Sequence, residues 1–194
     1  MTGSVLTAEY ETNPNSPWIE TFTGLEFHFM NPQPDEIDMK DIATSLSKQC
    51  RFGGHCTIFY SVEHSVYIAD WLYEQTNDSI LAFQGLLHDA SEAYLIDIPR
   101  PIKPFLTNYY DIEGRVMEAI FNRFNLPIKL DNRIKDADSR ILVDERRDVM
   151  SNSGNVWQTD SLLPLGVTIV GLSPSEAEEL FIDRVRKYSR NING

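Results

Sequence analysis

A histidine and three acids stand close together after an apolar stretch of the sequence. In GLLHDASEAYLIDIP, residues 85–99, a leucine pair is followed by His88, Asp89, Glu92 and Asp97. If the helix predicted there continues, Glu92 lies four positions after His88 and three after Asp89, so the three side chains address one volume. Imidazole and carboxylate groups are ligands for divalent metals. Metal chemistry is therefore one candidate for the role of this stretch.

Two further polar residues fall on predicted core helices. Asp138 lies four residues after Ile134 and four before Leu142, on the apolar stripe of a predicted helix. His64 lies in the first turn of another. A buried carboxylate without a partner is costly, so we expect Asp138 to face a cation, a metal or a strong hydrogen-bond donor. Taken one at a time, His64, His88, Asp89 and Asp138 could each be an ordinary residue of the core or a helix flank with its hydrogen bonds satisfied. Together they place His, His-Asp and Asp on three separate helices.

This arrangement resembles the signature of the HD-domain phosphohydrolase superfamily, which surrounds one divalent metal. The segment HDASEAYLIDIPRPIK, residues 88–103, is similar to the motif of its small YfbR-like 5′-deoxynucleotidase branch. There an acid follows His-Asp by three positions, and another precedes a proline-containing loop that ends in Lys. DIATSLSKQCRFGGHCTIFYSVEHS, residues 41–65, resembles the helix and loop before the first ligand, as in phage dATP triphosphohydrolases of the DatZ type. The resemblance covers about residues 36–148.

The resemblance implies a role for each of these residues. The implied metal ligands are His64, His88, Asp89 and Asp138. The ion would be one of Co, Mn, Zn, Fe, Ni or Mg, because nitrogen and carboxylate ligands do not select between them. Glu92 would be the general base or water-orienting acid and Asp97 a second catalytic acid, while Arg51 and Lys103 would meet phosphate.

The segment RFGGH, residues 51–55, allows two interpretations. Its two glycines let the backbone turn tightly and approach a ligand. His55 would then contact phosphate or sugar, or it would only close a loop. Phe52 would pack against a base or sugar, or within the core. His28 alternates with aromatic residues on a predicted strand, and we expect a structural role for it.

The chain has no histidine after position 88. The resemblance therefore excludes binuclear members, which place further histidines between His-Asp and the last Asp. The resemblance implies that the protein is an enzyme, a metal-dependent phosphohydrolase of 2′-deoxynucleotides. Two reactions remain open: release of triphosphate from a dNTP such as dATP, and release of phosphate from a dNMP. The RFGGH segment and the short spacing to Asp138 favour the triphosphohydrolase slightly. A non-catalytic nucleotide-binding or regulatory module is a further alternative.

Composition limits the partners of the chain. Its 194 residues suit a single domain, 1–194, with residues 1–17 as an irregular arm. A formal net charge of −12 argues against binding a nucleic-acid polymer. No apolar run approaches the roughly 18 residues of a membrane span, and no signal peptide is visible. We expect a protein of the bacterial or phage-infected cytoplasm, with inert thiols at Cys50 and Cys56 and, by resemblance, a homo-oligomeric assembly.

Hydrophobic periodicity predicts an all-α fold, a mainly helical bundle with a minor N-terminal β-hairpin around Thr23 and Gly24. Ser61 is the expected N-cap of one helix. Ser173, Pro174 and Glu176 form a capping box that opens the last helix. The predicted helices span about 38–50, 61–75, 79–95, 109–127, 131–150 and 173–187.

Overall fold

The computed structural model describes residues 17–190, so nearly all of the arm expected at 1–17 lies outside the described residues. The described part is mainly helical, with one two-stranded hairpin, which confirms the predicted fold class. None of its helices is long and apolar enough to cross a membrane. The helices are α2 (Met39–Leu46), α3 (Ser61–Thr76), α4 (Ser79–Leu86), α5 (Glu92–Leu95), α6 (Tyr109–Arg123), α7 (Asn132–Val149) and α8 (Pro174–Ser189), with 3-10 turns η1 (Pro34–Glu36), η2 (Arg51–Gly54) and η3 (Lys103–Phe105).

The hairpin lies where the sequence predicted it. Strand β1 (Trp18–Glu20) pairs antiparallel with β2 (Glu26–His28), and the turn between them contains Gly24 at a φ of 86°, a conformation that favours glycine. Nδ1 of His28 lies 2.8 Å from a carboxylate oxygen of Glu36, which ties β2 to η1. His28 therefore has a structural contact away from the other histidines.

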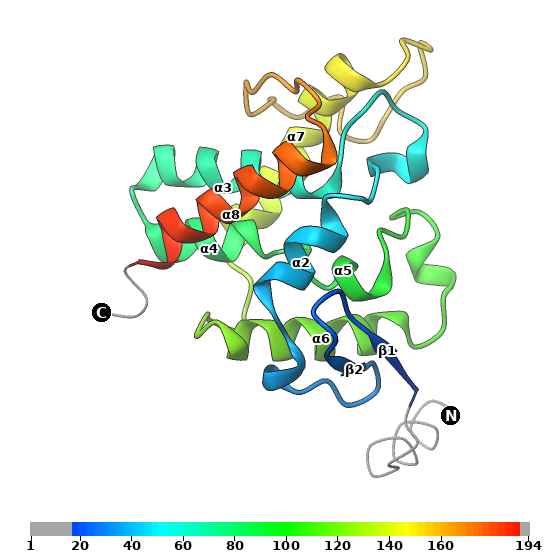
Figure 1. Ribbon diagram of the computed structural model, residues 1–194. Helices are drawn as coiled ribbons and strands as arrows, with labels where there is room; N and C mark the ends of the chain where they lie inside the picture. The colour runs from blue at the N-terminus through cyan, green and yellow to red at the C-terminus, as the bar shows by residue number, and fades with distance from the viewer. Residues whose placement is uncertain (1–16, 191–194) are drawn as a thin grey trace.

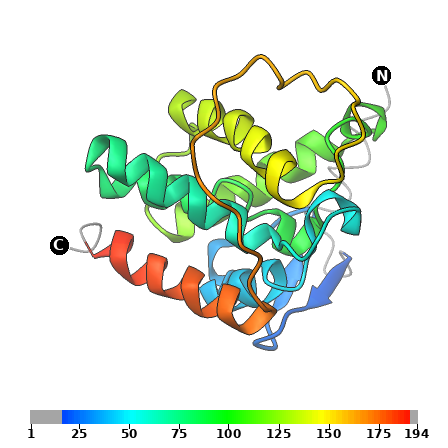
Figure 2. The ribbon, with the colours of Figure 1, turned by 90° about the horizontal axis from the view of Figure 1, so that it is seen from above.

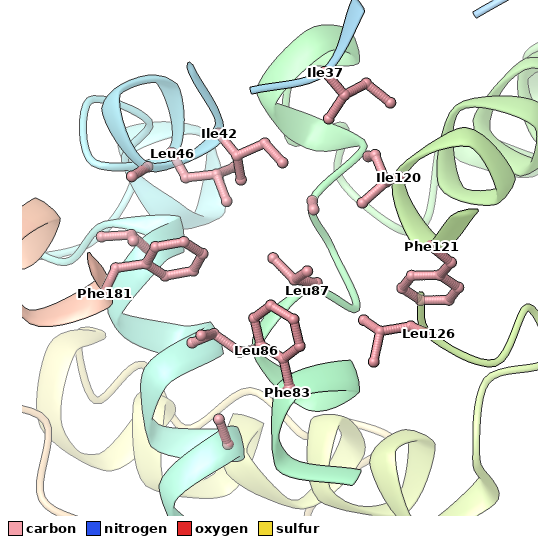
Figure 3. Close-up of a cluster of buried hydrophobic side chains, with 14 of the residues drawn as sticks. Ile37, Ile42, Leu46, Phe83, Leu86, Leu87, Ile120, Phe121, Leu126 and Phe181 are labelled. Atoms are coloured by element: carbon pink, nitrogen blue, oxygen red, sulfur yellow. The ribbon is translucent and has the colours of Figure 1, made fainter. Parts of the chain in front are cut away.

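Helix α3 is the centre of the bundle and contacts α2, α4, α7 and α8. Helices α3, α4 and α8 pack side by side (Figure 1). The largest core cluster lies between α2, α3, α4, α6 and α8, and Figure 3 shows Ile42, Leu46, Phe83 and Phe181 pointing into it. Ile42 and Leu46 are fully buried, as their helical spacing predicted. This packing fixes α3 and α4, which carry the two histidines of interest.

The prediction of one continuous helix over 79–95 is wrong. Helix α4 ends at Leu86, and α5 begins only at Glu92. In a continuous helix the carbonyl of Gly85 would accept from the N–H of Asp89. Here that carbonyl oxygen accepts instead from the His88 backbone N–H (3.5 Å), and the Nδ1 atom of His88 lies 2.8 Å from it. The His88 side chain thus helps to end α4, and the following turn carries Asp89 toward the other acids.

Of two predicted helix starts, that of α3 differs by one residue and that of α8 is confirmed. The N-cap of α3 is Tyr60 rather than Ser61, because the Glu63 carboxylate accepts a hydrogen bond from the Tyr60 N–H (3.3 Å). Helix α8 starts as predicted, with a capping box between Ser173 and Glu176. A reciprocal cap of this kind stabilises a helix start by roughly 1 kcal/mol.

Residues 150–172, called the strap below, contain no helix or strand and run outside the helices from α7 to α8 (Figure 2). Side chains of α7 hold the strap through its backbone. Asp144 accepts hydrogen bonds from the N–H groups of Leu165 (2.7 Å) and Gly166 (3.2 Å). The other anchors on α7 are Arg140, Arg146, Arg147 and Asp148. The strap is therefore fastened along the outer side of α7.

Two glycines of the strap provide a matched test of this fastening. Gly171 and Gly154 have nearly the same φ, 70° and 73°. A Cβ on Gly171 would lie 2.2 Å from the carbonyl oxygen of Ile58, whereas nothing lies within 4 Å of one on Gly154. Both alanine variants carry the left-handed cost of about 1–2 kcal/mol.

We expect Gly171→Ala to lower the free energy of unfolding by about 1–3 kcal/mol more than Gly154→Ala, because only the former forces two backbone segments apart. Denaturant unfolding of both variants measures the difference. Equal destabilisation would show that the strap end yields freely at Ile58.

Candidate metal centre

Two histidines and two aspartates from three parts of the fold converge at one point. His64 comes from α3, His88 and Asp89 from the turn after α4, and Asp138 from α7. Each offers one ligand atom, and these atoms all lie within 4.8 Å of one another. Nε2 of His64 is 3.3 Å from Asp138 Oδ1, and Nε2 of His88 is 3.1 Å from Asp89 Oδ2. The structure thus brings together the four residues that the sequence suggested as metal ligands.

The histidine rings are oriented as metal ligands would be. Their Nδ1 atoms face acceptors: that of His88 the Gly85 carbonyl oxygen, and that of His64 the Glu145 carboxylate at 2.5 Å. Their Nε2 atoms are buried and have no hydrogen-bond partner. Leaving a buried Nε2 atom unpaired costs about 1–3 kcal/mol. A histidine that binds a metal through Nε2 usually donates its Nδ1–H to an acceptor such as these. The four residues therefore fit a divalent ion.

Electrostatics in the cluster keep its acids charged. Burial alone would raise the pKa of Asp138, but close contact with the rings of His64 and His88 and attraction to them hold that pKa well below its ordinary value. Burial lowers the pKa of His88, yet its attraction to Asp89 and Asp138 outweighs burial and raises the pKa well above the usual range. The carboxylates are thus ionised at neutral pH, and the centre can hold positive charge.

Glu92 lies beside these acids at the start of α5 and is only 4% exposed. Its Oε2 atom has no hydrogen-bond partner. Burial, followed by repulsion from Asp89 and Asp97, raises its pKa well above the ordinary value. Gln49 fixes this segment, because its amide donates to the Glu92 carbonyl (2.9 Å) and accepts from the Asp97 N–H (3.0 Å). A carboxyl group in such a setting is suited to proton transfer.

A cavity of about 490 Å³ opens next to the cluster. It is lined by the acids Asp89, Asp138, Glu92 and Asp97, and also by Phe52 and by residues 156–159 of the strap. Its other lining residues include the three cationic side chains Arg51, Arg100 and Lys103. A pocket that combines acids at a metal centre with cations and aromatic walls suits a small anionic organic ligand.

Each cation of the pocket is already paired with an acid. Arg51 is buried, with Nη2 3.4 Å from Glu145 and Nη1 3.8 Å from Asp97. Lys103 Nζ lies 2.9 Å from Glu113 and 4.0 Å from Glu92. Arg100, whose side chain is 64% exposed, contacts Asp138 at 2.7 Å. An incoming anion would therefore compete with these carboxylates for the cations.

The RFGGH segment divides between the pocket and the surface. Phe52 lines the pocket, with its ring centroid 6.0 Å from that of Trp157 on the strap. His55 is exposed and is not among the pocket-lining residues, and its N–H donates to the Phe52 carbonyl. This position favours the loop-closing interpretation of His55. Cys50 and Cys56 are free thiols with their sulfur atoms 3.8 Å apart.

Two residues of the site, Glu145 and Trp157, were not predicted from the sequence. Glu145 is fully buried against His64 and Arg51. It stands seven positions after Asp138, on the same helix face, so the apolar stripe that revealed Asp138 could have revealed it too. Trp157 reaches the pocket from the strap, where Arg146 lies over its ring at 5.1 Å. No periodicity marks a tryptophan in an irregular segment, so only tertiary structure could place it.

Comparison with known proteins identifies the family of the chain. It is 35% identical over 174 residues to YfdR of Escherichia coli (strain K12), an uncharacterized protein, and the match covers 89% of this chain and 96% of YfdR. A second uncharacterized protein, from Rhodobacter capsulatus, is 33% identical over 127 residues, 62% of this chain and 64% of that protein. No family model matches. The chain belongs to the same family as YfdR, and the name of that protein states no activity.

The candidate metal centre can be tested through stability. We expect Mn²⁺ or Co²⁺ to raise the melting temperature, because an ion present at 100 times its Kd stabilises the folded state by about 2.7 kcal/mol. Asp138→Asn removes a ligand charge and should abolish most of this shift. Asp136→Asn is the control, since that side chain lies on the same helix in an exposed ion pair with Arg140. Equal shifts in both variants would place the ion elsewhere.

Proposed function

We propose that this protein is an HD-domain phosphohydrolase that hydrolyses 2′-deoxynucleotides with one divalent metal ion. The proposed reaction converts a dNTP such as dATP, with water, into the deoxynucleoside and inorganic triphosphate. One observation carries the proposal: the cluster of His64, His88, Asp89 and Asp138 adjoins a buried glutamate, Glu92, in a cavity lined by cations. The signature resemblance supplies the nucleotide class and, as a further prediction, a homo-oligomeric assembly.

The acids of the pocket would divide the proton transfers. When bound, a divalent ion supplies Lewis-acid chemistry: it polarises a phosphoryl oxygen and lowers the pKa of a water molecule. Glu92 accepts the proton of the water that attacks the α-phosphorus. The bond between that phosphorus and the 5′ oxygen breaks, and the 5′ oxygen takes a proton relayed through Glu92 and Asp97. The raised pKa of Glu92 supports this role, since a more basic carboxylate accepts a proton more readily.

The cations and the aromatic wall would bind the rest of the substrate. Arg51, Arg100 and Lys103 line the cavity together, and three cations match the charge of a triphosphate better than that of a monophosphate. Phe52 and Trp157 offer ring faces against which a base or sugar could pack. This distribution supports a nucleotide with its phosphates toward Arg51 and its base toward the strap.

A second candidate is 5′-deoxynucleotidase activity on dNMPs. The observation in its favour is that all three cations are already paired, Arg51 with Glu145, Lys103 with Glu113 and Arg100 with Asp138. A monophosphate would need fewer of these pairs to open. Both reactions break the bond next to the 5′ oxygen, so the same acids serve either.

A substrate panel distinguishes these candidates. The purified protein is incubated with Mn²⁺ or Co²⁺ and with each dNTP, each dNMP and their ribose counterparts, and products are separated by chromatography. Deoxynucleoside with intact triphosphate supports the proposal, and deoxynucleoside from dNMPs alone supports the second candidate. If no nucleotide is hydrolysed under any metal, the enzymatic proposal is wrong and a binding role takes its place.

Glu92→Gln tests the assignment of the base. We expect this variant to lose at least about 100-fold in kcat, since general-base catalysis contributes typically 10²–10⁴-fold, while Mn²⁺ affinity stays within a few fold. Glu118→Gln, an exposed change on α6, should leave both quantities unchanged. Full turnover by Glu92→Gln would remove Glu92 from the mechanism without affecting the metal assignment.

A further inference from the structure

Glu145 is a fully buried acid that no part of the proposed reaction uses. Its side chain comes from α7, one face of which also carries Asp138. Burying a carboxylate costs several kcal/mol unless charges and hydrogen bonds compensate it. Among the described residues 17–190, the compensation comes from Nδ1 of His64 at 2.5 Å and Nη2 of Arg51 at 3.4 Å.

The two oxygens of Glu145 contact different parts of the site. Oε1 faces His64, whose Nε2 belongs to the candidate metal centre, and Oε2 faces Arg51, which lines the cavity. An acceptor at Nδ1 fixes the tautomer and the ring orientation of a histidine and raises its basicity at Nε2. The same carboxylate restrains a buried arginine whose other ion pair, with Asp97, is longer at 3.8 Å.

We propose that Glu145 is a positioning residue that joins the metal centre to the anion-binding wall of the pocket, by holding His64 through one carboxylate oxygen and Arg51 through the other. This inference rests on the proposed function. It assigns Glu145 no proton transfer and no contact with substrate. It requires that a single change at Glu145 weakens both the binding of metal and the binding of a polyphosphate.

A purely structural role predicts something different. If Glu145 only satisfied two buried cations, its replacement would lower stability but leave ligand affinities intact in the folded fraction. Asp144 provides the matched comparison, because it is the neighbouring residue, is also fully buried and also bonds two partners, the strap and Arg147. Neither His64 nor Arg51 is among its hydrogen-bond partners.

The test compares Glu145→Gln with Asp144→Asn by calorimetric titration. We expect Glu145→Gln to weaken Mn²⁺ binding by about 10- to 100-fold, the usual effect of losing a partner behind a ligand histidine. Binding of inorganic triphosphate at saturating Mn²⁺ should weaken as well, and Arg51→Met should weaken triphosphate binding with a smaller effect on Mn²⁺. Asp144→Asn should change neither affinity by more than a few fold, even if it melts earlier.

Unchanged Mn²⁺ affinity in Glu145→Gln overturns the inference, and so does weakened Mn²⁺ binding with unchanged triphosphate binding. Failure of the wild-type protein to bind Mn²⁺ at all would instead contradict the proposed function.

Should Glu145→Gln not fold, the wild-type protein with Zn²⁺ gives a separate readout by nuclear magnetic resonance. There the His64 Nδ1 proton should be shifted far downfield and protected from solvent exchange, as expected for a short bond to a carboxylate. A proton that exchanges with water would contradict the role of Glu145.

Discussion

The organisation of this protein depends on holding like charges close together where three of its helical segments meet. Asp89, Glu92 and Asp138 lie around one point, and repulsion among them is relieved by His64, His88 and Arg51. Desolvation opposes each of these charges, so the arrangement persists only where opposite charges are held at short range. A divalent ion would add the positive charge that this set of acids can accommodate.

Helix α7 serves both sides of this arrangement. Its inner face carries Asp138 and Glu145 toward the histidines, and its apolar residues Ile134 and Ile141 pack against α3 and α4. Other side chains of α7 hold the strap, which carries Trp157 at the cavity. A shift of α7 would therefore disturb the candidate metal centre and the pocket wall together, which explains why many charged residues on this helix have defined partners.

The comparison of prediction with structure shows where local rules suffice. The helical spacing of Ile42 and Leu46 and the capping box at Ser173 were confirmed, since both depend on neighbours a few residues away. The prediction of a continuous helix over 79–95 was wrong, since the Gly85 carbonyl oxygen is bonded by the N–H and the Nδ1 atom of His88 and not by the N–H of Asp89. The four proposed ligands converge even so, because the turn after α4, like the predicted helix, directs His88 and Asp89 to one side.

The sequence by itself determined the helical class, the hairpin and the residues capable of binding a metal, because residue type and periodicity are local properties. Tertiary structure alone decided that Glu145 stands behind His64, that Trp157 reaches the pocket and that His55 does not line it. These facts depend on contacts between distant residues, such as His64 with Glu145, 81 residues apart in the chain. Local propensity carries no information about such pairs, since their geometry is set by how α3 and α7 pack.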